Sequence, residues 1–209
     1  MFCAWLLGAK RTAQPSSRGV MAVAAVLALT GLALMGNGAA IHAKAALAQY
    51  LLKQAFAESL ATGQPVKPWA WADTWPVARL EVSRLGASAI VLKGGSGQAL
   101  AFGPGHLENT PQPGDEGASV IAAHRDTHFA FLRDVKLGDE IQVTRADGAI
   151  FWFRVTAKAV VPWNASGIDP QMDGRWLVLS TCWPLDAMTP GEERLVVKAH
   201  ITGRQIRSG

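Results

Sequence analysis

The residue of greatest chemical interest is Cys182, which ends an apolar run, Leu177–Cys182, two positions before Pro184. The apolar and β-branched residues of this run predict a strand, and the proline prevents further pairing beyond it. The other cysteine, Cys3, lies before a predicted membrane span, so we do not expect the two thiols to pair. A free thiol is either an inert apolar side chain or a nucleophile. The residues that surround Cys182 in the fold must decide between these roles.

A cysteine nucleophile needs a partner that accepts and returns a proton, and this partner is most often a histidine. His124 resembles Cys182 in its placement, because it follows the apolar run 118–123 at the point where a loop begins. The histidines at 42, 106 and 200 fall in an apolar span, a Pro/Gly loop and the last predicted strand. His128 lies four residues after His124, which leaves a zinc site open. No third ligand stands out, so we predict no metal and no cofactor.

An acyl-transfer site also needs a group that stabilises the developing oxyanion, and an arginine can do this or can anchor the substrate. Arg194 begins a predicted strand twelve residues after Cys182. It follows two glutamates, so a surface ion pair of little energetic value is the alternative. Both interpretations of Arg194 remain open from the residues alone.

These three residues require a scaffold that brings distant strand ends together. From Val77 onward, short apolar runs alternate with turns, and residues 145–149 are typical of a hairpin. Seven or eight strands with little helix predict an all-β, closed barrel. Two segments, 124–138 and 162–175, are longer than hairpin turns, and loops of this length often carry function. The expected strands are 77–85, 88–92, 118–123, 139–145, 149–160, 176–181 and 193–202.

The N-terminal part has a different composition from the rest of the chain. Residues 19–43 contain no Asp, Glu, Lys or Arg, and 25 residues in a helix are long enough to cross a bilayer. A cleaved signal peptide is the alternative, but so long an apolar region favours an uncleaved anchor. Three positive residues precede the span, which predicts a cytoplasmic N-terminus and an exported domain.

The net charge of +4 does not indicate a nucleic-acid binder. Four basic residues within the first 45 positions account for the whole excess, because the remaining chain has 16 basic and 16 acidic residues. Phosphate binding requires basic groups clustered on the folded surface. We therefore predict no nucleic-acid partner.

Two segments connect the span to the barrel. Residues 45–62 have helical periodicity and no Gly or Pro, which predicts a helix that acts either as a stalk or as an element packed on the domain. The stretch 68–76 then contains Trp69, Trp71 and Trp75 between two prolines. It can be a membrane-interface belt, a binding strip or a strap packed over the barrel.

The three candidate residues and their contexts resemble the sortases, the cysteine transpeptidases of bacterial cell surfaces. The Thr-Leu-x-Thr-Cys motif of that family is similar to residues 178–182, which read Val-Leu-Ser-Thr-Cys. His124 closes one strand and Arg194 begins another in the expected order. The tryptophan-rich stretch and the His-Arg-Asp-Thr context at 124–127 resemble the sortases of Gram-negative bacteria.

The resemblance implies a sortase β-barrel that cleaves a Leu-Pro-x-Thr-Gly-like sorting signal between Thr and Gly. Cys182 would form the thioacyl-enzyme, His124 would transfer protons, and Arg194 would stabilise the oxyanion or hold the substrate. Thr181 and Trp183 are candidates for substrate binding. The partners implied are proteins that carry the sorting signal, an unidentified amine acceptor and the inner membrane.

The expected organisation has four parts: a cytoplasmic segment at 1–18, a transmembrane anchor at 19–43, a helical stalk or linker at 44–67 and a catalytic barrel at 68–209. The barrel would face the periplasm from a single-pass anchor in the inner membrane. Two alternatives remain. One is another cysteine acyl-transferase, such as an L,D-transpeptidase, although the usual Ser-x-Gly-Cys context is missing. The other is a non-catalytic periplasmic β-barrel module that binds a partner.

Overall fold

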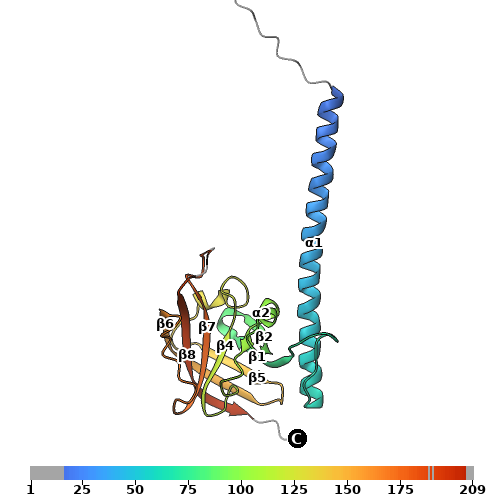
Figure 1. Ribbon diagram of the computed structural model, residues 1–209. Coiled ribbons are helices and arrows are strands. Elements are labelled where there is room, and N and C mark those ends of the chain that lie inside the picture. Colours follow the sequence, from blue (N-terminus) through green and yellow to red (C-terminus); the bar gives the residue numbers. More distant parts are fainter. Residues whose placement is uncertain (1–16, 188, 190, 206–209) are drawn as a thin grey trace, which may run out of the picture. The chain divides into compact units, whose positions relative to one another are not determined.

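A computed structural model describes residues 17–187, 189 and 191–205 of the chain (Figure 1). Contacts divide the chain into two compact units, Met1–Lys44 and Ala45–Gly209. The expected cytoplasmic segment 1–18 lies outside the described residues, except for its last two positions.

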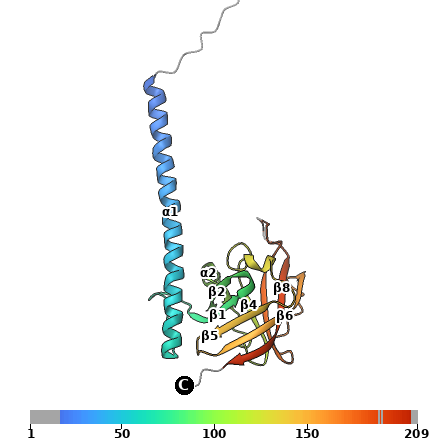
Figure 2. The same cartoon turned by 180° about the vertical axis from the view of Figure 1, so that it is seen from behind.

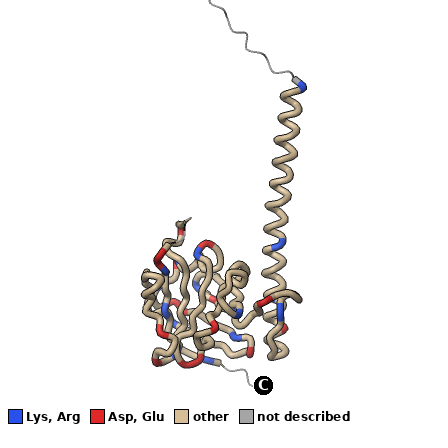
Figure 3. Tube along the Cα trace, in the orientation of Figure 1, with Lys and Arg blue, Asp and Glu red and all other residues tan. Residues whose placement is uncertain are grey.

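The helix α1, Ser17–Thr62, covers both the expected span and the helix expected after it. Its stretch Arg18–Thr62 is long and apolar enough to cross a membrane, and none of its most apolar window is buried by protein. Figure 3 shows much of this helix without charge, whereas the barrel carries both signs intermixed. Exposed apolar side chains on a helix of this length are typical of a lipid-facing segment.

The last turns of α1 belong to the barrel unit and pack on it. Leu52 and Phe56 are buried in one cluster with Ile90 and Leu92 of the barrel. Burial of each such side chain stabilises the fold by about 1.5 to 3 kcal/mol. Of the two roles expected for residues 45–62, packing on the domain is therefore the one observed.

The eight strands close into a barrel in the order β1-β2-β3-β4-β7-β8-β6-β5 (Figures 1 and 2). This confirms the predicted all-β barrel with short helices. Most neighbours are antiparallel, but β2–β3 and β4–β7 run parallel, and the β4–β7 pair is central to the candidate site. The strands are β1 Pro76–Val82, β2 Ala87–Lys93, β3 Gly105–His106, β4 Gly117–Ala122, β5 Glu140–Arg145, β6 Ile150–Pro162, β7 Arg175–Trp183 and β8 Glu193–Gln205.

Three elements differ from the sequence-based expectation. The strand expected to reach residue 85 ends at Val82 and continues as the short helix η1, Ser83–Leu85. The helix α2, Gly97–Phe102, was not expected, and the Ser96 hydroxyl caps its start by accepting a hydrogen bond from the Ala99 amide at 3.1 Å. The third difference is β7, which continues to Trp183, so that Cys182 lies inside the strand.

The tryptophan-rich stretch is only partly packed on the barrel. The Trp69 ring meets Phe102 edge to face with 5.0 Å between centroids, and the Lys93 ammonium lies 4.5 Å from the Trp75 ring centroid. Trp71 is 81% exposed. Two of the three indoles therefore serve the strap role, and Trp71 remains free for another.

The two faces of the β4-β7-β8 sheet pack against different groups. Leu177, Leu179 and Leu195 face the barrel interior and belong to its main core. The alternate residues Val178 and Val196 form a separate outer cluster with β4, and the β6–β7 segment covers this cluster through residues such as Ile168 and Met172. The period-two alternation of a strand therefore identifies the outer face as the side that carries Cys182 and Arg194.

Candidate active site

Cys182 and Arg194 lie directly opposite each other in the antiparallel β7–β8 ladder. Directly opposite residues in such a pair project from the same face, with Cβ atoms roughly 5 Å apart. Cys182 is a free, half-buried cysteine, and Arg194 is also half-buried. The ladder register therefore places the thiol and the guanidinium side by side on the outer face.

Backbone carbonyl groups hold the Arg194 guanidinium in place. Its Nη1 donates to the carbonyl oxygens of Gly191 at 2.9 Å and Glu193 at 2.8 Å. Gly191 is required for this arrangement, because a Cβ there would lie 2.4 Å from the carbonyl oxygen of Trp183. A surface ion pair was the alternative interpretation of Arg194, but this arginine makes no ion pair with any described residue.

His124 reaches the same site through the parallel β4–β7 pair. Ala122 is paired with Ser180, and the Ala123 amide donates to the Ser180 carbonyl at 3.2 Å. The pairing ends at Ala122 and Ser180. His124 and Cys182 each lie two residues beyond this last pair, at the same end of the two strands. His124 is exposed to solvent.

Thr181 holds these two strand ends together. Its hydroxyl donates to the Ala123 carbonyl at 2.7 Å, and the residue is only 3% exposed. It lies between Ser180 and Cys182 on one strand and bonds to the residue before His124 on the other. Thr181 therefore positions the two reactive residues, and its burial does not favour the predicted role in substrate binding.

A second contact joins the loop of His124 to the loop between β7 and β8. The Arg125 Nη2 donates to the Thr189 carbonyl at 2.7 Å. The chain after His124 turns back on itself, because the Phe129 amide donates to the His124 carbonyl at 3.1 Å and Phe129 is fully buried. Both loops around the reactive residues are thus fixed to each other and to the core.

The remaining histidines are not equivalent to His124. Burial and, to a smaller extent, the nearby charge of His124 lower the pKa of the half-buried His128 from its ordinary value. His106 is buried, with its Nε2 2.9 Å from the Pro111 carbonyl oxygen, and His200 packs edge to face on Trp176. Among the residues that the structure describes, no group of three or more His, Cys, Asp or Glu side chains could hold a metal ion.

A model of the sortase domain matches residues 80–202, which include β2 to β7, most of β8 and all three candidate residues. The chain belongs to the sortase family. This confirms the resemblance inferred from the motif at residues 178–182.

Among characterised relatives, the chain is 26% identical over 118 residues to sortase D of Bacillus subtilis (strain 168). This match covers 56% of the chain and 60% of the length of that relative. Sortase E from Streptomyces avermitilis has a similar structure, with a TM-score of 0.52 and 32% identity over 62% of this chain and 90% of that one. A sortase D5 transpeptidase from Clostridium perfringens shares the fold, with a TM-score of 0.58, 23% identity and coverage of 75% and 96%.

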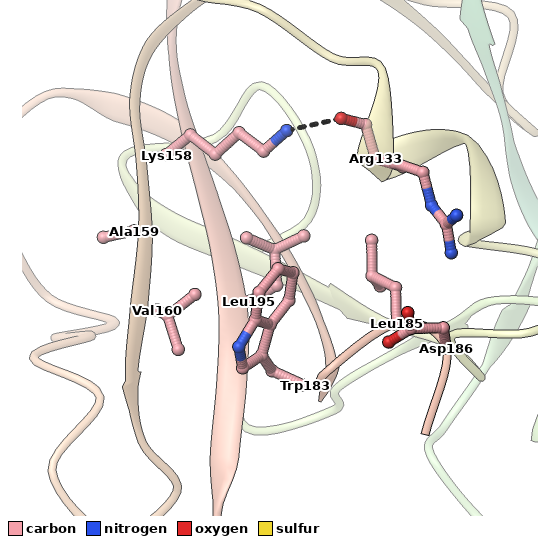
Figure 4. Close-up of a pocket in the computed structure, with 8 residues that line it drawn as sticks. All are labelled: Arg133, Lys158, Ala159, Val160, Trp183, Leu185, Asp186 and Leu195. Carbon is pink, nitrogen blue, oxygen red and sulfur yellow. Dashed lines mark hydrogen bonds between the residues drawn. The ribbon is translucent and has the colours of Figure 1, made fainter. Parts of the chain in front are cut away.

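The sortase barrel also contains a pocket of about 460 Å³ (Figure 4). Trp183 and Leu195 form part of its wall, and they lie on either side of the Cys182–Arg194 pair, because Trp183 is paired with Glu193 and Leu195 with Thr181. Since Trp183 packs against the main core, its side chain faces the opposite side of the sheet from Cys182. The substrate contact expected at Trp183 stays a prediction. The remaining lining residues are Arg133, Lys158, Ala159, Val160, Leu185 and Asp186.

Sequence reasoning did not find the charged residues of this pocket. Arg133 comes from the short helix η2, Ala130–Arg133, whereas Lys158 lies on β6 and Asp186 follows β7. The Lys158 ammonium donates to the carbonyls of Arg133 at 2.9 Å and Val135 at 3.0 Å, and it thereby fixes η2 against β6. Each of these charges is isolated in the sequence, where it is indistinguishable from a solvated surface residue.

Proposed function

We propose that the chain is a membrane-anchored cysteine transpeptidase that cleaves a Leu-Pro-x-Thr-Gly-like sorting signal between Thr and Gly. The observation that carries this proposal is the register that pairs Cys182 with Arg194 on one face, with His124 two residues beyond the end of the adjacent strand β4. A thiol nucleophile beside an imidazole and a cation is the arrangement that acyl transfer requires. The substrates are proteins that carry the signal, and the product is an amide with an amine acceptor.

In the first half-reaction, the Cys182 sulfur attacks the threonyl carbonyl carbon and a tetrahedral oxyanion forms. Arg194 stabilises this oxyanion or holds the substrate beside it. The carbon–nitrogen bond then breaks, and His124 supplies the proton that the departing glycine amine requires. A thioester between Cys182 and the threonyl carbonyl remains.

In the second half-reaction, an acceptor amine attacks the thioester carbon and gives a proton to His124. The carbon–sulfur bond breaks, and its electron pair returns to the Cys182 sulfur. The enzyme is thereby regenerated, and His124 holds again the proton that it gave away in the first half-reaction.

The proposed location is the inner membrane, with the N-terminus in the cytoplasm and the barrel in the periplasm. The apolar length of α1 and the basic residues that precede it support this orientation. A proteolysis experiment on spheroplasts tests it. Protease added outside should digest the barrel and spare an N-terminal tag, and the reverse pattern would contradict the orientation.

The reaction is tested with the full-length chain in detergent micelles, an amine and a peptide that contains Leu-Pro-x-Thr-Gly. Mass spectrometry should find the peptide cut after Thr and joined to the amine. The Cys182→Ala variant should form neither product. Cleavage at another bond, or equal product from Cys182→Ala, would contradict the proposal.

A further inference from the structure

The first part of the barrel unit exposes three large apolar side chains. Leu47 and Tyr50 on α1 are 56% and 57% exposed, and Trp71 in the tryptophan-rich stretch is 81% exposed. None of the three belongs to a buried cluster or packs against one. A single exposed apolar side chain is ordinary, but several on adjoining segments indicate a surface that contacts something apolar.

Two contacts place Trp71 beside α1. The Gln49 side-chain amide donates to the Phe102 carbonyl at 2.7 Å, and the Trp69 ring packs on the Phe102 ring. The Ala72 amide then donates to the Trp69 carbonyl at 3.0 Å, which closes a turn that contains Trp71. Because Gln49 and Trp69 contact the same residue, this turn lies at the level of Gln49. This is the part of α1 that carries the other two exposed side chains.

The charge pattern of α1 relates this level to the proposed bilayer. Residues 19–43 carry no charge, and Lys44 is the first charged residue after them. Leu47 and Tyr50 lie about 4.5 and 9 Å beyond Lys44 along a helix axis. The headgroup layer extends about 5 to 7 Å beyond the hydrocarbon on each side of a bilayer. Helical side chains tilt towards the N-terminus, so both of these reach back towards the apolar stretch.

The chemistry of the exposed side chains suits a headgroup layer. Indole and phenol rings combine an apolar body with a polar N–H or O–H group, and both are enriched where membrane meets water. The other two indoles of the tryptophan-rich stretch already contact the barrel. Trp71 is therefore the indole of this stretch that is left for a contact with lipid.

We propose that Leu47, Tyr50 and Trp71 form a lipid-contacting surface that lies in the headgroup layer of the membrane crossed by α1. The inference rests on the proposed single-pass anchoring. The surface combines a helix with a separate turn, so it gives the barrel a second point of attachment beside the anchor itself. The barrel is thereby restrained from turning freely about the end of the anchor. A protein partner is the competing occupant, and it would have to displace this lipid.

The test measures quenching of tryptophan fluorescence by lipid. The full-length chain is reconstituted into phosphatidylcholine vesicles whose acyl chains are brominated near the headgroup end. The difference in emission between the wild type and Trp71→Phe isolates Trp71 among the eight tryptophans of the chain. This emission should be strongly quenched, relative to vesicles without bromine, because the indole lies next to the upper acyl chains.

A second exposed indole provides the matched control. Trp163 is 60% exposed and follows β6, which contributes no residue to the proposed surface. Its emission, isolated with Trp163→Phe, should be quenched much less than that of Trp71. In the Trp71→Phe background, Tyr50→Trp should restore the strong quenching. Equal quenching of Trp71 and Trp163, or none of Trp71, would overturn the inference and leave a protein partner as the occupant.

A position inside the apolar stretch separates this inference from the anchoring on which it rests. Leu29 is 68% exposed on α1. In the Trp71→Phe background, Leu29→Trp should be quenched most by lipids brominated near the end of their acyl chains. Quenching at position 29 without quenching of Trp71 would overturn the lipid-contacting surface and leave the anchor intact. Absence of quenching at position 29 would contradict the anchoring and this inference together.

Discussion

At the scale of single residues, the site depends on side chains whose backbones are held by strand pairing. Cys182 and Arg194 occupy opposite positions of one ladder, and His124 follows a strand paired in parallel with β7. Replacement of one side chain should therefore remove a chemical group without moving the other two. This makes single substitutions informative about catalytic roles.

His124 and His128 lie four residues apart and provide a matched pair of positions for substitution. His124→Gln should lower kcat/KM for the sorting-signal peptide by about 10² to 10⁴, the usual value of a general acid–base. His128→Gln should leave it within about threefold, because burial lowers the pKa of His128 and keeps its ring neutral and unsuited to protonate a leaving amine. Steady-state kinetics of both variants checks this. Equal losses from the two substitutions would mean that His124 has no special role.

Arg194 is expected to act through charge and geometry together. Arg194→Gln should lower kcat/KM by about 10² to 10³, comparable to the loss of an oxyanion donor. Arg194→Lys should recover only part of this loss. An ammonium lacks the planar fork of donors with which a guanidinium can bond the Gly191 carbonyl and the substrate at the same time. Arg154→Gln on the neighbouring strand serves as the control. If Arg194→Gln and Arg154→Gln are equally active, Arg194 is only a structural cation.

At the scale of elements, the parallel β4–β7 pair brings the strand ends next to Cys182 and His124 together. Only the backbone ladder and the Thr181 hydroxyl bond are needed to hold the two strand ends at this register. The β7–β8 loop adds a second connection through Arg125 and Thr189. The proposed catalytic alignment therefore depends on strand ends that are held together by these bonds.

Thr181→Val tests this role of the strand ends. The change keeps the shape of the side chain but leaves the Ala123 carbonyl without its donor, which should destabilise the fold by about 1 to 3 kcal/mol. It should also lower kcat more than it raises KM, because the misalignment affects the chemical step. Denaturant unfolding and steady-state kinetics measure the two effects. The control is Thr156→Val on β6, whose exposed hydroxyl makes a longer bond of 3.3 Å to the Lys198 carbonyl, and a similar result for both threonines would contradict the assignment.

The sequence was informative wherever an element has a repeating pattern. The apolar, β-branched run Leu177–Cys182 predicted β7, and the apolar run before His124 predicted β4. The two-residue strand β3 and the six-residue helix α2 are too short to show any periodicity. The extension of β7 through Cys182 depends on its ladder with β8, which no local pattern reveals.

The sequence singles out the candidate residues of the site, but it does not reveal their surroundings. Cys182, His124 and Arg194 carry unusual chemistry at strand boundaries, so their types and spacing single them out. Arg125, Arg133 and Asp186 become notable only when distant segments meet. Thr181 was assigned to substrate binding because it neighbours the nucleophile, but strand alternation turns its side chain inward.

At the scale of the whole molecule, titratable side chains of the barrel make its stability depend on pH. The pKa values of His106 and His128 are both lowered, with burial as the main cause. The pKa of Asp139 is lowered mainly by its hydrogen bonds with Arg84, of 2.6 and 2.7 Å. These groups titrate in different ranges of pH.

Acidification from pH 7.5 to 5 should destabilise the domain through the two histidines. Because their pKa is lower in the folded state than the ordinary value of 6.5, the unfolded chain binds more protons in this range and is favoured as the pH falls. The Asp139 contribution should persist until the pH falls below its ordinary pKa of 3.8. Denaturant midpoints across this range should decrease, and His128→Gln should flatten the decrease. A constant or rising stability of the wild type on acidification would contradict this account.

The central claim is that Cys182 carries the substrate as a thioester. Its most direct test is the intact mass of the full-length chain after brief reaction with a Leu-Pro-x-Thr-Gly peptide in the absence of an amine acceptor. The account predicts a mass increase equal to the acyl fragment that ends in Thr, located on Cys182 by peptide mapping and removed by hydroxylamine. An adduct that persists in Cys182→Ala, or no adduct while the peptide is consumed, would contradict it.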